Sequence, residues 1–207
     1  MTSLPQRPRI GFLASHNGTN MRAIVAACKQ GRLSAEPALL ISNNKDCGAI
    51  AWADLQSLPW QHLSATKVGS EDALDAAMTD ALKAANVDLI VLAGYMRKLG
   101  PKILAAFPKR ILNVHPALLP KFGGQGMYGK HVHEAVLKAG DRISGATIHI
   151  VDGEYDHGPI VIQGEVKVDA GDTPDTLAAR VQAKEQEMYP QVLQKIFSGQ
   201  IDLDKLS

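Results

Sequence analysis

Cysteine and long apolar runs are scarce in this sequence. It holds only two cysteines, Cys28 and Cys47. Two are too few for a disulfide framework, and their spacing fits no metal site, so we expect two buried free thiols in helical segments. No apolar run approaches the roughly 20 residues of a membrane helix, which argues against a membrane protein. Residues 1–15 also lack the apolar core and cleavage pattern of a signal peptide.

A surplus of charge of either sign is also absent. Lys and Arg number 22 against 21 Asp and Glu, which gives a formal net charge of +1. Such a balance provides no overall field for nucleic acid or for an anionic membrane. We therefore expect a soluble, cytoplasmic protein without nucleic-acid or membrane partners.

Short apolar runs alternate with longer helical patterns along most of the chain. Strands are predicted at residues 10–14, 38–41, 88–93 and 111–114, and helices at residues 20–30, 49–55, 71–85 and 101–107. This alternation predicts an α/β fold with a Rossmann-like, mostly parallel sheet flanked by helices. The length suits one domain spanning residues 1–207, and no repeat or linker divides it.

The C-terminal third has a different pattern. Residues 143–151 and 159–168 read as extended strands joined by only seven residues, which predicts an antiparallel addition to the sheet. A final helix should begin after Thr173 as N-cap, with Pro174 in its first turn. Pro190 should kink this helix or end it near Tyr189.

Ligands of open parallel sheets bind beyond the carboxyl ends of the strands, and polar clusters follow several strands here. In LASHNGTNMRAI, residues 13–24, Gly18 allows a tight turn before a helix. The amides of Gly18, Thr19 and Asn20 would attract a phosphate at the helix N-terminus. The stretch matches neither GxGxxG nor GxxxxGK[ST]. Ordinary capping chemistry accounts for the same residues equally well.

The second cluster lies in RILNVHPALLPKFGG, residues 109–123. Side chains alternate along a strand, so Asn113 and His115 point to one side, and Pro116 then ends the strand. An imidazole and a carboxamide placed there could stabilise a developing oxyanion. A histidine that only bonds a backbone carbonyl is the alternative, and the neighbouring amide favours the site.

Acidic and histidine side chains gather in HIVDGEYDHG, residues 149–158. Asp152, Glu154 and Asp156 lie there beside His149 and His157, and one carboxylate could reach His115 and relay a proton. Plain turn chemistry explains acidic residues in a loop at least as well. The spacing matches no known ligand pattern, so no metal is predicted.

The final helix carries polar residues on its apolar side. Glu185 falls inside the apolar stripe and Gln182 lies at its margin, which indicates ligand contact unless that end of the helix simply reaches solvent. The stripe itself consists of Leu177, Val181, Met188, Val192 and Ile196.

Together these segments resemble one family, the phosphoribosylglycinamide (glycinamide ribonucleotide) formyltransferases of purine synthesis. The matching stretches run over nearly the whole chain and include RIGFLASHNGTN, SNNKD, DLIVLAGYMRKL, RILNVHPALLPKF, SGATIHIVDGEYDHGPIVIQ and DTLAARVQAKEQEMYP. The HPALLP and YDHGPI segments are the most specific, although variants of them occur in related folate-dependent formyl-transfer enzymes.

The resemblance implies a transferase that moves the formyl group of 10-formyltetrahydrofolate, as cosubstrate, to the amine of glycinamide ribonucleotide in de novo purine (IMP) biosynthesis. The products would be formylglycinamide ribonucleotide and tetrahydrofolate. The amine attacks directly through a tetrahedral oxyanion, without a metal or a covalent enzyme intermediate. Asn113 and His115 correspond to the oxyanion-stabilising pair, Asp156 to the carboxylate that keeps His115 protonated, and His149 to a second histidine nearby.

Binding roles follow from the same resemblance. The N-terminal half would form the phosphate and nucleotide side of the site, and the C-terminal half the folate and catalytic side. The active protein would be a monomer or a homodimer. Substrate contacts are implied for Asn17, Gly18, Thr19, Asn20, Gln182 and Glu185, and folate contacts for Met96, Arg97, Leu99, Val151, Asp152 and Asp156.

Three positions depart from the family pattern. His16 stands where many members have glycine, the segment at residues 123–129 is longer than in the shorter members, and Glu71 replaces an arginine that some members use. The alternatives are a formyltetrahydrofolate hydrolase, another folate-dependent formyltransferase or a noncatalytic nucleotide-binding module. A hydrolase typically has a second histidine where this chain has Pro116, and a methionyl-tRNA formyltransferase usually extends further at its C-terminus.

Overall fold

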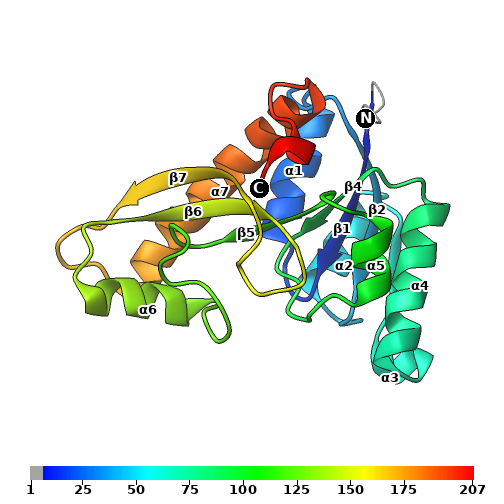
Figure 1. Ribbon diagram of the computed structural model, residues 1–207, viewed down its shortest axis with the longest axis horizontal. Coiled ribbons are helices and arrows are strands. Elements are labelled where there is room, and N and C mark those ends of the chain that lie inside the picture. Colours follow the sequence, from blue (N-terminus) through cyan, green and yellow to red (C-terminus); the bar gives the residue numbers. More distant parts are fainter. Residues whose placement is uncertain (1–6) are drawn as a thin grey trace.

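A computed structural model describes residues 7–207 of the chain (Figure 1). Residues 1–6 lie outside this description. They belong to the N-terminal stretch interpreted above and to the predicted domain 1–207. One mixed sheet of seven strands runs through the molecule. Its strands are β1 (Arg9–Ala14), β2 (Glu36–Ser42), β3 (Trp60–His62), β4 (Leu89–Leu92), β5 (Ile111–His115), β6 (Ile143–Ile150) and β7 (Ile160–Lys167). The helices are α1 (Thr19–Lys29), α2 (Gly48–Leu55), α3 (Ala65–Val68), α4 (Glu71–Ala84), α5 (Pro101–Ala106), α6 (Lys130–Ala139) and α7 (Pro174–Phe197), followed by the short 3-10 helix η1 (Leu203–Lys205).

The strand order is β3-β2-β1-β4-β5-β6-β7. The strands from β3 to β5 are parallel, whereas β6 runs antiparallel to both β5 and β7. This arrangement confirms the predicted Rossmann-like sheet with its antiparallel addition. The chain moves outward from β1 to β3 and returns to β4 on the other side of β1, so the strand order reverses between β1 and β4.

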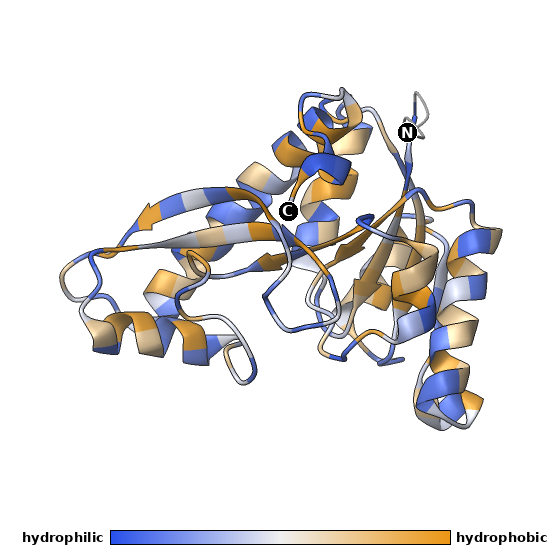
Figure 2. Ribbon diagram, viewed as in Figure 1, coloured by the Kyte–Doolittle hydropathy of each residue, from blue (hydrophilic) through white to orange (hydrophobic). Residues whose placement is uncertain are grey.

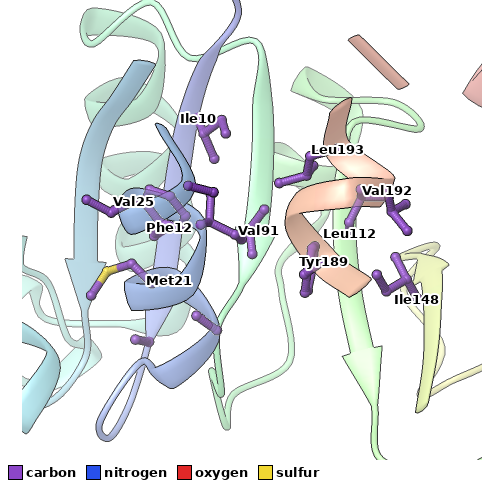
Figure 3. Close-up of a cluster of buried hydrophobic side chains, with 14 of the residues drawn as sticks. Ile10, Phe12, Met21, Val25, Val91, Leu112, Ile148, Tyr189, Val192 and Leu193 are labelled. Atoms are coloured by element: carbon purple, nitrogen blue, oxygen red, sulfur yellow. The ribbon is translucent and has the colours of Figure 1, made fainter. Parts of the chain in front are cut away.

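Two apolar clusters cover the two faces of the parallel strands. Successive side chains of β1 point to opposite faces, so Phe12 joins one cluster and Leu13 the other. Residues of α1 and α7 pack on the first face, where Tyr189 and Leu193 are fully buried (Figure 3). Helices α4 and α5 cover the second face (Figure 1). Hydrophobic residues concentrate in the central strands, whereas the outer turns are largely hydrophilic (Figure 2).

Helix α7 begins as predicted, but it does not break at Pro190. Thr173 is the N-cap, with its side chain accepting from the Thr176 amide, and the helix continues through Pro190 to Phe197. The predicted end near Tyr189 was therefore wrong. Proline removes one helical hydrogen bond, but Tyr189, Pro190 and Leu193 are buried in the core, and this burial holds the helix together across the missing bond.

Both cysteine expectations need partial correction. Cys47 is buried but lies at the N-cap of α2 and not within a helix. Cys28 lies in α1 and is only half-buried, because its position on that helix turns partly toward the surface; burial still raises the pKa of its thiol to about 11. Among residues 7–207, no helix is long and apolar enough to cross a membrane.

Candidate active site

A cavity of about 720 Å³ opens beyond the carboxyl ends of β1, β4 and β5. This is the position at which the strand order reverses, where sheets of this type bind ligands. The lining comes from six parts of the chain: residues 16–20, 93–96, 113–116, 124–129 and 155–156, and Gln182 with Glu185 of α7.

His115, at the end of β5, contacts two oxygen atoms through its ring. Its Nδ1 lies 3.2 Å from Asp156 Oδ2, and its Nε2 lies 2.7 Å from the carbonyl oxygen of Phe122. A carboxylate and a carbonyl oxygen only accept hydrogen bonds, so both ring nitrogens act as donors. The buried ring therefore faces a hydrogen-bond acceptor at each of its nitrogens.

Asp156 is the acidic partner that the loop between β6 and β7 supplies. Its φ of 55° places the residue in the left-handed region, and this turn directs the carboxylate inward. Oδ2 also accepts from the Gly124 amide at 3.1 Å. Burial by itself raises the pKa of Asp156, but hydrogen bonds with His115 and His149, the charge of His115 and the Gly124 amide together lower that pKa well below its usual range. Asp156 is thus a fixed negative charge.

Asn113 and His149 complete a chain of polar contacts. They face each other in the register of β5 and β6, with Asn113 Nδ2 3.1 Å from His149 Nε2. The same His149 nitrogen lies 3.6 Å from Asp156 Oδ1, while His149 Nδ1 donates to the Ile150 carbonyl at 3.0 Å. Asn113, His149, Asp156 and His115 therefore form one connected chain on the wall of the cavity.

The turn before α1 forms the far wall of the cavity. Gly18, the N-cap of α1, has a φ of 59°, which is strained for residues with a side chain. Asn20 Nδ2 donates to Glu185 Oε2 at 2.8 Å, and Gln182 Nε2 donates to Thr19 Oγ1 at 3.3 Å. These contacts join α7 to the turn.

Glu185 is an ionisable group in a buried position, with 8% of its surface exposed. Burial raises its pKa to about 7, although the hydrogen bond from Asn20 and the charge of His115 oppose that rise. The same cavity therefore contains one carboxylate fixed in its charged form and another that exchanges its proton near neutral pH.

The predicted folate contacts are not all brought to the cavity. Met96 lines it together with Asp156. Leu99 is buried in the cluster under α4 and α5, and Val151 packs partly buried against the same cluster. Asp152 is exposed and accepts from the Glu154 amide. Arg97 forms an exposed ion pair with Glu71, the residue that stands where some family members have arginine.

Several lining residues were not anticipated from the sequence. Gln125, Met127 and Tyr128 come from the longer segment at residues 123–129, and Tyr155 precedes Asp156. Tyr128 and Tyr155 are about half exposed, so both present aromatic surface at the mouth of the cavity. The sequence offered one signal for two of these residues: Tyr128 is an aromatic residue next to a glycine, and Tyr155 is an aromatic residue in the acidic loop. The Phe122 carbonyl gave no signal, because every residue has one.

The fold and this site define a class of group-transfer enzyme. Residues 8–193 match the model of the formyl transferase family, and the chain belongs to that family. It is 42% identical to the chloroplastic phosphoribosylglycinamide formyltransferase of Arabidopsis thaliana, over 95% of this chain and 68% of that protein. It is 35% identical to the phosphoribosylglycinamide formyltransferase of Escherichia coli, over 94% of this chain and 89% of that protein.

A solved structure supports the same assignment. Glycinamide ribonucleotide transformylase 1 from Symbiobacterium toebii superimposes with a TM-score of 0.88 at 38% sequence identity, and the match covers 94% of this chain and 89% of that one. The family match and these relatives agree with the family resemblance found in the sequence.

Proposed function

We propose that this protein transfers the formyl group of 10-formyltetrahydrofolate to the amine of glycinamide ribonucleotide, as a step of de novo purine synthesis. The observation that supports this most strongly is the chain from Asn113 through His149 and Asp156 to His115, in a cavity that also reaches the turn before α1. The relatives named phosphoribosylglycinamide formyltransferase support the choice of substrates.

The ribonucleotide occupies the side of the cavity formed by residues 16–20. Its phosphate accepts from the amides of Gly18, Thr19 and Asn20 at the N-terminus of α1, where the helix dipole favours negative charge. Asn17 completes that turn. Gln182 and Glu185 contact the rest of this substrate from α7.

The formyl donor occupies the opposite side. Met96 packs against its ring system, and the loop that carries Asp156 closes the other face. Leu99 and Val151 support these walls from the core, and Asp152 holds the loop through the Glu154 amide. The backbone of Arg97 bonds the edge of the ring, while its side chain pairs with Glu71.

The reaction begins when the substrate amine attacks the formyl carbon, and the formyl oxygen gains negative charge. His115 donates to this oxyanion as an imidazolium, and the amide of Asn113 supplies a second donor. Asp156 stabilises the charge on His115. The bond from carbon to N10 then breaks, and the proton lost by the amine moves to N10 with the help of water. The new carbon–nitrogen bond leaves the formyl group on the ribonucleotide.

His115 must first release its present partner. Its Nε2 donates to the Phe122 carbonyl, so the formyl oxygen has to take the place of that carbonyl. The turn at residues 122–124 also touches Asp156 through Gly124. Binding of the formyl donor therefore shifts this turn while the contact between Asp156 and His115 is kept.

A hydrolase that releases formate is the second candidate from the same chemistry, because water could replace the amine. The transferase is favoured because the cavity extends past His115 to Glu185 and the α1 turn, which a water molecule does not need. We further propose that the protein works in the cytoplasm as a monomer or a homodimer, without nucleic-acid or membrane partners.

A transfer assay tests the proposed function. Purified protein is mixed with 10-formyltetrahydrofolate, with and without glycinamide ribonucleotide, and tetrahydrofolate, formate and formylated ribonucleotide are measured. We expect tetrahydrofolate and formylated ribonucleotide to appear together, and only with both substrates present. Formate release at an equal rate without the ribonucleotide would establish the hydrolase instead. Binding without turnover under either condition would establish a noncatalytic module.

A further inference from the structure

Ser15 lies at the seam between the two sides of the cavity. It follows β1 directly, is 4% exposed, and precedes the turn at residues 16–20. Its amide donates to the Gly94 carbonyl at 3.0 Å, and its Oγ accepts from the Met96 amide at 2.9 Å. One residue therefore bonds twice to the loop after β4, which forms the opposite wall.

The hydroxyl group of Ser15 has a defined orientation. Its Oγ donates to Asn43 Oδ1 at 2.6 Å, in the loop after β2. A serine hydroxyl has one proton and two lone pairs. Because the proton is used on Asn43, a lone pair remains directed at the Met96 amide. Asn43 thus orients the hydroxyl, and the hydroxyl fixes Met96.

We propose that Ser15 is a positioning residue that holds the wall from Gly94 to Met96 in register with the phosphate turn, and so sets the spacing between the two substrates. This inference rests on the proposed function. Ser15 touches neither reacting group. Its hydrogen-bond partner Met96 and the next residue of the chain, His16, line the cavity, but Ser15 itself does not.

The side chain of Met96 explains why its backbone must be fixed. This side chain is 45% exposed at the cavity mouth, and methionine has an unbranched chain that adapts to many shapes. A flexible side chain gives a defined wall only if its backbone is anchored. The Ser15 hydroxyl is the anchor for the Met96 amide, and loss of one such hydrogen bond weakens binding by about fivefold to tenfold.

The test compares Ser15→Ala with Ser42→Ala, a matched control. Ser42 is fully buried at the end of the neighbouring strand β2, but its hydroxyl bonds locally, to Asn44 and to Cys47 Sγ at the N-cap of α2. We expect Ser15→Ala to raise KM for 10-formyltetrahydrofolate about fivefold to tenfold. In the same variant, KM for the ribonucleotide should change less than about twofold, a split that a general loss of folding would not produce. Calorimetric titration with tetrahydrofolate should show the same loss of affinity.

Asn43 provides an independent variant that leaves Ser15 in place. Asn43→Asp keeps an acceptor for the hydroxyl and should retain the wild-type KM, whereas Asn43→Ala should shift KM in the same direction as Ser15→Ala. If Ser15→Ala does not fold, the comparison of the two Asn43 variants decides. Equal KM values in Ser15→Ala and Ser42→Ala, or in the two Asn43 variants, would overturn the inference. Absence of transfer by the wild-type protein would instead refute the proposed function.

Discussion

At the scale of single residues, two carboxylates of one cavity have pKa values shifted in opposite directions. Asp156 gathers donors from His115, His149 and Gly124, which outweigh the effect of its burial. Glu185 is more deeply buried, and its hydrogen-bond donor is the side-chain amide of Asn20. The effect of burial therefore prevails, and the pKa of Glu185 is raised. The depth of burial and the number of donors facing each carboxylate thus together decide which of the two stays charged.

Replacing Glu185 should remove a pH-dependent part of stability. Its pKa rises from 4.5 to about 7 on folding. Between pH 4.5 and pH 7, the folded state therefore binds a proton that the unfolded state has released. The stabilisation is complete below pH 4.5 and is lost as the pH rises through 7, by an amount on the order of 3 kcal/mol. Urea unfolding at pH 5 and pH 8 measures it. Relative to Glu185→Gln, the wild type should lose stability at the higher pH; parallel pH dependence in both proteins would contradict this.

The sequence identified these residues to different degrees. Asn113 and His115 stand out because they interrupt an apolar strand, and Glu185 because it interrupts an apolar stripe. The partner of His115 could not be chosen by spacing among Asp152, Glu154 and Asp156, because the left-handed turn at Asp156 decides it. Ser15 looks like any residue that follows a strand.

At the scale of elements, long periodic segments were predicted well and short ones were missed. The apolar runs of β1 and β4 identify buried strands, because they are too short for a helix and are bounded by polar or turn residues. Strand β5 is recognised in the same way from Ile111, Leu112 and Val114, despite the interruption at Asn113. Strand β3 has only three residues, too few for a periodic signal. Helix α6 does carry apolar residues at helical spacing, Val132, Val136 and Leu137, but it follows a glycine-rich segment that reads as a loop, and it was missed for that reason.

Helix α7 connects the core to the site, so its core residues should determine global stability. Leu193 is fully buried against α1 and the sheet (Figure 3). Leu193→Ala should lower the free energy of unfolding by about 2–5 kcal/mol, because it leaves a cavity. Leu55→Ala, at a position 81% exposed, should change it by less than about 0.5 kcal/mol. Chemical denaturation measures both, and similar losses would show that α7 does not form part of the core.

The turn at residues 122–124 should affect catalysis through its contact with Asp156. Gly124 has a φ of 93° in open space, so Gly124→Ala strains the backbone without a clash and disturbs the amide bonded to Asp156. We expect kcat/KM to fall about tenfold, as for a lost hydrogen bond to a charged group. Gly171 has a φ of 89°, also in open space, in the turn between β7 and α7. Gly171→Ala carries the same strain and should keep the kcat/KM of the wild type. If both variants lost kcat/KM equally, the loss in Gly124→Ala would come from reduced stability and not from the contact with Asp156.

At the scale of the whole molecule, the topology explains why residues from distant parts of the chain share one cavity. Parallel strands place their carboxyl ends at one edge, and the reversal of order between β1 and β4 leaves a crevice there. The antiparallel β6 and β7 then return the chain, so the loop between them brings Asp156 to the end of β5. Sequence patterns predicted the edge, but not which loop residues turn inward, since Leu99 and Val151 face the core.

The central claim is that His115 and Asp156 act as one unit on the developing oxyanion. Steady-state kcat/KM for formyl transfer, measured for His115→Ala, Asp156→Asn and the double variant, tests this most directly. Each single change should cost about 10²–10³-fold, and the double variant should lose little more than the worse single one. A double variant whose loss equals the product of the two single losses would show that the residues act independently and would contradict the account.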